Sequence, residues 1–331
     1  MALHAVRAVG DAVTGTRRFL TPFDVRRWLK LAVVVFFVGG GTNLTSMQYD
    51  FSGVPDGIPE DGIEIPFALP TDVAQLVGAI VVGAVLLAIA FGIVGAIMEF
   101  VFVESLRSGD VLVRRYWSQR WRQGLRLFGF RVAIGLPFLG LVLGWMALFV
   151  VPLVTGISGP TVPFAVFLLG LPVLFVVGLL YGLVSSFTTA FVVPIMIKED
   201  TGVLAGWRRL WSSITAEWKE YLAYAVLGFL LTIATGLLAS IALGLAAVVL
   251  LVPLVVLAVV TYLTVSLTST IGLVVVGGLV LLFVVTMIVL WALVQVPVLT
   301  YLRYYALLVL GDVDASFDII ADQRAAIRSE E

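Results

Sequence analysis

The chain has 331 residues, of which 61% are hydrophobic and 12% are charged, and its mean hydropathy is +1.13. Soluble domains carry about 25% charged residues, so this composition excludes an ordinary water-soluble fold and predicts an integral membrane protein. The net charge of −1 argues against nucleic acid as a partner, and the absence of cysteine together with a single histidine, His4, argues against thiol chemistry and histidine-based zinc sites.

The apolar runs are unbroken and longer than the roughly 20 residues that a spanning helix needs. Membrane β-strands would instead alternate apolar and polar residues, so the expected fold is an all-α integral membrane domain. Polar and charged residues continue through Thr21 before the first long apolar run, which does not fit a cleavable signal peptide. Six transmembrane helices are predicted, at about 29–47, 73–101, 132–154, 163–196, 221–248 and 272–302.

The last apolar stretch is the least defined part of this topology. Residues 221–302 contain no charged side chain and could hold two long spans or three. Pro253 and the polar patch 261–270 are the candidate breaks. With two spans, residues 249–271 are expected to form an outer apolar excursion, either a short interfacial helix or a re-entrant one.

The distribution of charge predicts the orientation of the spans. All 20 lysines and arginines fall in the inner segments 1–30, 99–131, 198–220 and 303–331. The first outer loop is acidic instead, and it lacks the fixed ligand spacing of a calcium-binding EF-hand. Because positive residues stay on the cytoplasmic side, we expect six spans in the cell membrane with both termini cytoplasmic. A seventh span would move Arg303 and the basic residues after it outside.

The chain repeats one pattern three times. Segments 17–28, 115–126 and 207–218 are each basic and aromatic, and each precedes a pair of apolar runs. The predicted unit is therefore an inner amphipathic helix followed by a helical hairpin. A single membrane domain is expected, with repeat units at approximately 1–103, 104–197 and 198–310 and an acidic cytoplasmic tail at 311–331.

The third inner segment shows the amphipathic pattern most clearly. Trp207 and Trp211 recur with other apolar residues at helical spacing, whereas Arg208 and Arg209 fall on another face. This pattern is typical of a helix lying in the membrane interface. It predicts either recognition of anionic lipid headgroups or of a cytoplasmic partner, or simple anchoring.

Glu99 is the acidic residue expected to be most deeply buried, about one turn from the inner boundary of the second span. Ionisable residues within a span are functional candidates. Arg131 or Arg303 could pair with Glu99, and the alternative is a role for Glu99 in binding an ion, a proton or a substrate. A transporter is expected to carry several intramembrane charges or helices broken at matching depths, and neither is evident.

Small residues recur every four positions along three spans, a pattern that lets helices pack closely. These stripes predict packing within the bundle or, alternatively, a homodimer interface. Their members are Ala84, Ala88, Gly92 and Ala96; Gly140 and Gly144; and Gly228, Thr232, Gly236, Ser240 and Gly244.

Residues 191–211, in which a span ends in Pro194 and an acidic residue, a glycine and a basic tryptophan-rich segment follow, resemble the membrane domain found beside some glycerophosphodiester phosphodiesterases. Residues 297–305 are similar to the end of that domain. Residues 17–24 look most like an uncharacterised membrane-protein family of halophilic archaea. The resemblance implies a helical membrane domain of undefined activity, because the phosphodiesterase chemistry resides in a separate soluble barrel.

These observations predict a non-enzymatic scaffold or accessory protein of the cell envelope that interacts with membrane lipids, with a membrane-protein partner or with a second copy of itself. A transporter or permease is the alternative. No catalytic, cofactor-binding or metal-binding residues are predicted. The candidate functional residues are Glu99, Arg131, Arg303, Arg208, Arg209, Trp207 and Trp211.

Overall fold

The computed structural model describes residues 4–43, 71–155, 161–264 and 270–329. Every regular element in these ranges is helical, as expected. In chain order the elements are α1 (His4–Leu20), α2 (Val25–Asn43), α3 (Thr71–Ser108), α4 (Val113–Thr155), α5 (Thr161–Phe187), the π-helical segment η2 (Thr188–Val192), α6 (Val193–Glu199), α7 (Val203–Ala216), α8 (Trp218–Thr264), α9 (Thr270–Val313), the short 3₁₀ segment η3 (Ala315–Phe317) and α10 (Ala321–Arg328).

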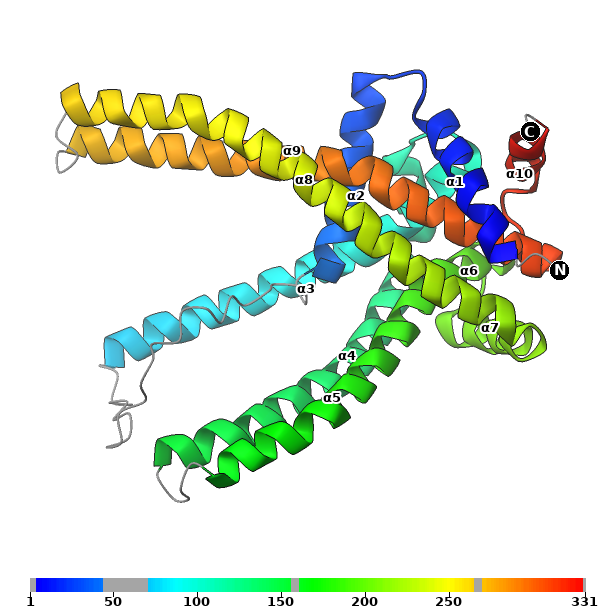
Figure 1. The fold of residues 1–331 in the computed structure, drawn as a ribbon, viewed down its shortest axis with the longest axis horizontal. Helices are drawn as coiled ribbons and strands as arrows, with labels where there is room; N and C mark the ends of the chain where they lie inside the picture. The colour runs from blue at the N-terminus through cyan, green and yellow to red at the C-terminus, as the bar shows by residue number, and fades with distance from the viewer. Residues whose placement is uncertain (1–3, 44–70, 156–160, 265–269, 330–331) are drawn as a thin grey trace.

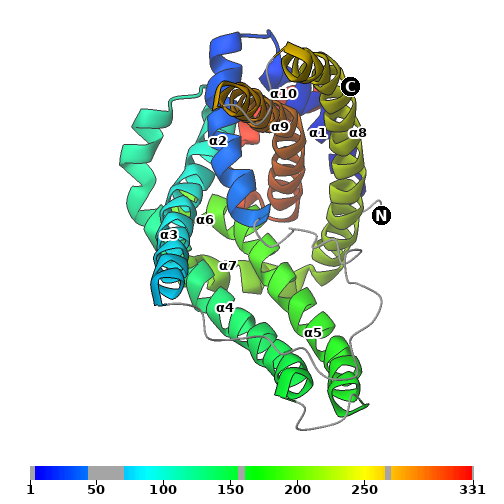
Figure 2. The same cartoon turned by 90° about the vertical axis from the view of Figure 1, so that its left-hand side faces the viewer.

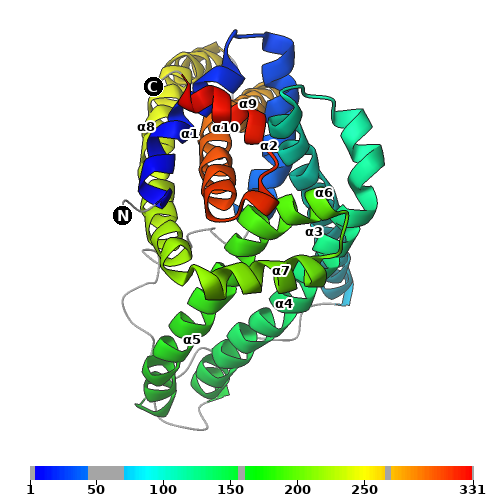
Figure 3. The ribbon, with the colours of Figure 1, turned by 90° about the vertical axis from the view of Figure 1, so that its right-hand side faces the viewer.

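The long helices converge at one end and spread apart at the other. Figure 1 shows three arms, which are α3, the α4–α5 pair and the α8–α9 pair. At the converging end, α1 packs along α9, α10 contacts α1, and α2 lies between α3 and α9. Figure 2 looks along the arms from their spread ends, and Figure 3 shows α1, α7 and α10 gathered across the converging end.

The buried core lies at the converging end. Leu31 of α2, Phe100 of α3, Ile195 of α6 and Leu308 of α9 are all completely buried. The spread halves of the helices instead present large apolar side chains outward, and Leu238 of α8 is 68% exposed. Apolar surface this extensive would cause a soluble protein to aggregate, whereas hydrocarbon solvates it.

Five helices are long and apolar enough to cross a membrane in the described ranges: Gln75–Ser108, Val113–Pro152, Phe164–Glu199, Trp218–Tyr262 and Val274–Val313. The first predicted span, at about 29–47, is not among them. Its counterpart is α2, whose 19 residues include Arg26, Arg27 and Lys30, and residues 44–47 lie outside the described part of the chain.

The predicted outer excursion at 249–271 is wrong where the structure describes it. Residues 249–264 continue α8 without a break, and α9 begins at Thr270. Pro253 lies inside α8 and does not end the helix, because neighbouring helices in a membrane can satisfy the one backbone group that a proline frees. The run 221–302 therefore forms two long paired helices rather than three.

The middle repeat unit also differs from the predicted pattern. Residues 115–126 form the first turns of α4 rather than a separate amphipathic helix. Between the inner segment and the span, Gly129 is the only glycine and there is no proline, and a glycine costs a helix only about 1 kcal/mol. In the first and third units the inner helix is separated from the helix that follows it. Pro22 lies between α1 and α2, and the non-helical residue Glu217 lies between α7 and α8.

Only part of the predicted small-residue stripes makes close contacts. A Cβ at Gly92 would lie 2.8 Å from the Phe128 ring, and Ala96 is completely buried. By contrast, a Cβ at Gly140, Gly144 or Gly236 would meet nothing within 4 Å. Among these stripe residues, Gly92 and Ala96 therefore pack closely within the chain, whereas Gly140, Gly144 and Gly236 on the arms do not.

The C-terminal segment is folded onto the N-terminal helix. Arg328 of α10 contacts Asp11 of α1 at 2.9 Å and Asp312 at 2.6 Å, and Arg324 contacts Asp312 and Asp318 at 2.8 and 2.6 Å. Hydrogen bonding to the Asp312 carboxylate holds the pKa of Arg328 above its ordinary value. These ion pairs join the two ends of the described chain.

Replacing Arg328 with glutamine should therefore release α10. The change removes charge-assisted hydrogen bonds to two carboxylates and leaves Asp11, which is 1% exposed, without its cation. Such bonds contribute about 1.5–3 kcal/mol, so limited proteolysis within 314–320 should be at least about tenfold faster than in the wild type. Unchanged proteolysis would show that the ion pairs do not hold α10 in place, and Arg122→Gln on α4 is the charge-matched control.

Candidate functional site

Glu99 lies on α3 among core residues and is completely buried. Its carboxylate contacts the guanidinium of Arg303 from α9 directly and lies 3.9 Å from Nη2 of Arg131 from α4. The structure thus brings together the three charged residues that the sequence singled out. Burying a charge costs far less when it is paired, and both arginines provide that pairing.

Both arginines also contact one residue of the π-helical segment. Arg303 donates from Nη1 to the backbone carbonyl of Thr189, and Arg131 donates from Nη2 to the Thr189 hydroxyl at 2.9 Å. Glu99, Arg131, Arg303 and Thr189 form what we call the Glu99 cluster. It joins α3, α4, α9 and the segment after α5, so each of the three predicted repeat units contributes to it.

The position of Pro194 explains why the Thr189 carbonyl is open to Arg303. The N–H of Val193 bonds to the carbonyl of Thr188, five residues back, in the π-helical pattern. In that register the next donor would be the N–H of residue 194, and proline has none. The carbonyl of Thr189 is therefore left without a helical partner. Single turns of π-helix frequently occur at functional sites.

The neighbouring Thr188 attaches α7 to the same segment. Its hydroxyl donates to the carbonyl of Val184 at 2.6 Å and accepts a hydrogen bond from Nε1 of Trp207 at 3.0 Å. Trp207 therefore points toward the protein rather than toward the membrane interface. Gly206 permits this contact, because a Cβ there would lie 2.8 Å from the side chain of Val192.

The other predicted residues of α7 lie outside the Glu99 cluster. Trp211 is 61% exposed, and Arg208 is exposed on the same side as Leu204, which is 76% exposed. Arg209 is exposed too and lies 3.5 Å from Glu199. The single apolar face expected for this helix is therefore divided, with Trp207 and Leu210 packed inward and Leu204 and Trp211 facing outward.

The charges of the Glu99 cluster do not balance. One carboxylate faces two guanidiniums, so the cluster carries one surplus positive charge at the converging ends of the helices. Sequence reasoning identified these three side chains from their rarity in apolar surroundings. It missed Thr189, and Pro194 was the one local signal that could have indicated a freed carbonyl.

A second polar cluster links α3, α4 and the end of α6. Arg120 contacts Glu104 at 2.7 Å, and Gln123 donates to Asp200 at 2.8 Å and to the carbonyl of Met196 at 3.1 Å. Asp200 has a left-handed backbone with φ of 52°. In the described residues, no group of three or more His, Asp and Glu side chains is arranged to hold a metal ion.

Comparison with known proteins gives a family and no activity. No curated protein and no solved structure matches the chain. The model of a family of unknown function, DUF7544, matches residues 3–320. Because that match covers nearly the whole sequence, the protein belongs to this family.

Proposed function

We propose that the protein is a non-enzymatic scaffold or accessory component of the cell membrane that binds and organises lipid at its inner face. It would cross the membrane six times, with α2 as the first span and with both termini in the cytoplasm. The arrangement of the arms supports an inner position for the basic segments. The basic segments, which are distant in sequence, meet at the converging end, and the exposed apolar arms extend away from it (Figure 1). The sixth span rests on the sequence, since α2 runs across the direction of the arms in Figures 1 and 2.

The outward face of α7 carries the proposal for lipid binding. Leu204 and Trp211 are seven residues apart, so they lie on one stripe of the helix, and the exposed Arg208 lies between them. Tryptophan favours the boundary between headgroups and hydrocarbon. A basic residue near an anionic surface contributes about 1 kcal/mol. Together these groups fit an anionic leaflet.

The Glu99 cluster supports a scaffold because its contacts are those of a joint between helices. Its carboxylate is engaged by two arginines, and the arginines in turn bind Thr189. Kinship with the phosphodiesterase-associated membrane domain, and an origin in halophilic archaea, remain predictions. Scarce lysine and the acidic first outer loop favour that origin.

Quenching of tryptophan fluorescence by brominated lipids tests the proposed function. In vesicles with brominated phosphatidylglycerol, the wild type should be quenched more than the Trp211→Phe variant, because Trp211 faces the headgroup region. Replacing Arg208 and Arg209 with glutamine should reduce the preference for brominated phosphatidylglycerol over brominated phosphatidylcholine by up to about 30-fold, given about 1 kcal/mol for each of the two charges.

The matched control for that experiment replaces both arginines with lysine, which keeps the charge and should keep the preference. Retention of lipid or of a fixed partner through purification in mild detergent would also support a scaffold. If Trp211 is not quenched by either lipid, α7 does not face the bilayer, and the proposal loses its basis.

A transporter is the second candidate, favoured by the π-helical turn η2 beside a buried charged cluster. The surplus positive charge there suggests an anionic substrate. Chloride, phosphate and acetate gradients across proteoliposomes should then drive measurable currents, and Arg131→Gln should abolish them while the contact between Glu99 and Arg303 remains. Absence of current with all three anions would count against this candidate.

A further inference from the structure

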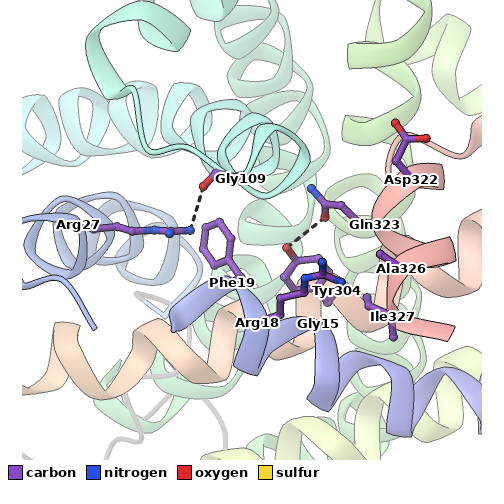
Figure 4. Close-up of a pocket in the computed structure, with 10 residues that line it drawn as sticks. All are labelled: Gly15, Arg18, Phe19, Arg27, Gly109, Tyr304, Asp322, Gln323, Ala326 and Ile327. Carbon is purple, nitrogen blue, oxygen red and sulfur yellow. Dashed lines mark hydrogen bonds between the residues drawn. The ribbon is translucent and has the colours of Figure 1, made fainter. Parts of the chain in front are cut away.

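A cavity of about 340 Å³ lies at the converging end, where α1, the first turns of α2, α9 and α10 meet beside Gly109 (Figure 4). It is separate from the Glu99 cluster and involves none of the residues of that cluster. Its size is at the lower end of the range for ligand pockets, roughly 300–1,000 Å³. The side chains that carry the argument are Arg18, Phe19, Arg27, Tyr304, Gln323 and Ile327.

The Arg27 side chain is held in place, yet one of its hydrogen-bond donors has no acceptor. Its Nη2 donates to the carbonyl of Gly109 at 2.9 Å, and its guanidinium carbon lies 4.4 Å from the centre of the Phe19 ring. Its Nε is buried and has no hydrogen-bond partner. A buried donor without an acceptor is costly, and an acceptor bound in the cavity would remove that cost.

The charge of the cavity favours an anion. Arg18 and Arg27 contribute two positive charges, and the one acidic lining residue, Asp322, is exposed. In Figure 4 the Asp322 carboxylate points away from the two guanidiniums. Guanidinium groups match the geometry of phosphate oxygens particularly well.

The remaining lining adds neutral polar groups and an apolar wall. Gln323 is fixed by hydrogen bonds to the carbonyls of Leu106 and Arg107, and the Tyr304 hydroxyl is within 3.3 Å of its Oε1. Phe19 and Ile327 supply apolar surface. A phosphate ester, which combines an anionic group with a carbon skeleton, fits this combination better than a bare inorganic ion does.

The surroundings of Arg27 connect the cavity to the membrane boundary. Phe23, just before α2, is 67% exposed, and Val25 and Leu29 in the first turns of α2 are 59% and 50% exposed. Such apolar side chains beside a charged helix end are typical of a segment at the edge of the bilayer. The tails of a lipid could lie along this surface while its headgroup enters the cavity.

We propose that this cavity binds a phosphate-ester anion through Arg18 and Arg27, either the headgroup of an inner-leaflet lipid or a soluble phosphate ester. The inference rests on the proposed lipid-binding function and assigns it a specific site. The cavity contains no residue of α7, so the two lipid contacts can be tested separately.

Native mass spectrometry of the delipidated full-length protein tests the inference. Phosphatidylglycerol should bind more tightly than phosphatidylcholine. The double variant Arg18→Gln/Arg27→Gln should weaken phosphatidylglycerol binding at least about tenfold, because charge-assisted hydrogen bonds are lost. Arg26→Gln is the matched control, since Arg26 is exposed, is adjacent to Arg27 in sequence and lies outside the cavity. The affinity of this variant for phosphatidylglycerol should equal that of the wild type.

A second variant keeps every charge. Ala326→Leu adds volume to the cavity wall on α10 and should also weaken binding, with size-exclusion chromatography verifying the fold of each variant. Glycerol 3-phosphate distinguishes the two sources of the anion. If it displaces phosphatidylglycerol and itself depends on Arg18 and Arg27, the site accepts soluble esters; if it does not bind, the site needs the lipid.

Two results would overturn the inference. One is wild-type affinity in both the double arginine variant and Ala326→Leu. The other is an equal loss in Arg26→Gln, which would indicate general electrostatic attraction. If the cavity variants bind normally while the α7 variants lose their lipid preference, the cavity assignment fails and the proposed function stands. If neither the cavity variants nor the α7 variants change lipid binding, the cavity assignment and the proposed function both fail.

Discussion

Replacing Glu99 with glutamine should lower the free energy of unfolding by about 3–5 kcal/mol, the cost of removing one partner from a buried ion pair. Glu99 is completely buried and Arg303 is 8% exposed, so water cannot replace the lost carboxylate. The amide of glutamine would leave two guanidiniums in apolar surroundings with no counter-charge. Unfolding of the purified protein in mixed micelles, titrated with dodecyl sulfate, would measure the change.

A double variant separates the loss of an ion pair from a general packing defect. Changing Arg303 to glutamine alongside Glu99→Gln removes one uncompensated cation, so the double variant should be more stable than Glu99→Gln alone. Glu199→Gln, which removes a partly exposed carboxylate 3.5 Å from Arg209, is the matched control and should change stability by less than about 1 kcal/mol. Equal stability of Glu99→Gln and wild type would show that the cluster does not hold the helices together.

Gly124→Ala should destabilise the contact between α3 and α4 by about 1–3 kcal/mol, the usual cost of overpacking. A Cβ at position 124 would lie 2.8 Å from the Cα of Ile97 and closer still to its side chain. Because a backbone atom blocks the space, the two helices would have to move apart. Thermal unfolding in detergent, monitored by circular dichroism, would report the change.

Gly129→Ala, on the same helix, should not destabilise the protein. Nothing lies within 4 Å of a Cβ at Gly129, and alanine is favoured over glycine within a helix by roughly 1 kcal/mol. This variant should therefore be as stable as the wild type or more stable. If both alanine variants behaved alike, the close approach of α3 and α4 at Ile97 would be wrong.

Periodicity and hydropathy predicted the helical class because the segments that form α3, α4, α5, α8 and α9 are long and apolar. The same information could not predict the lengths of the helices. Pro253 was interpreted as a break, yet helix α8 continues past it. The basic and aromatic pattern of residues 115–126 predicts a separate helix, yet these residues continue into the span, because the one glycine that follows, Gly129, weakens a helix without ending it.

The Glu99 cluster was predictable in part. A carboxylate amid apolar residues needs a counter-charge, and few cations lie near enough to the predicted inner boundary, so Arg131 and Arg303 could be named. The participation of Thr189 could not be predicted, because it depends on a shift to the π-helical pattern that no local sequence rule specifies. The division of α7 likewise depends on which neighbours it meets, since Trp207 finds an acceptor in Thr188 while Trp211 finds none.

The central claim is that the protein spans the membrane with its basic segments on the cytoplasmic side. The chain has no cysteine, so single cysteines can be introduced as the sole targets for a membrane-impermeant thiol reagent. In intact cells, cysteine substituted for Ser118 or Ser212, both exposed at the converging end, should stay unlabelled until the cells are permeabilised. Cysteine in place of Ser52, in the acidic first loop, should be labelled at once. Labelling of the first two positions and protection of the third would contradict the proposed orientation.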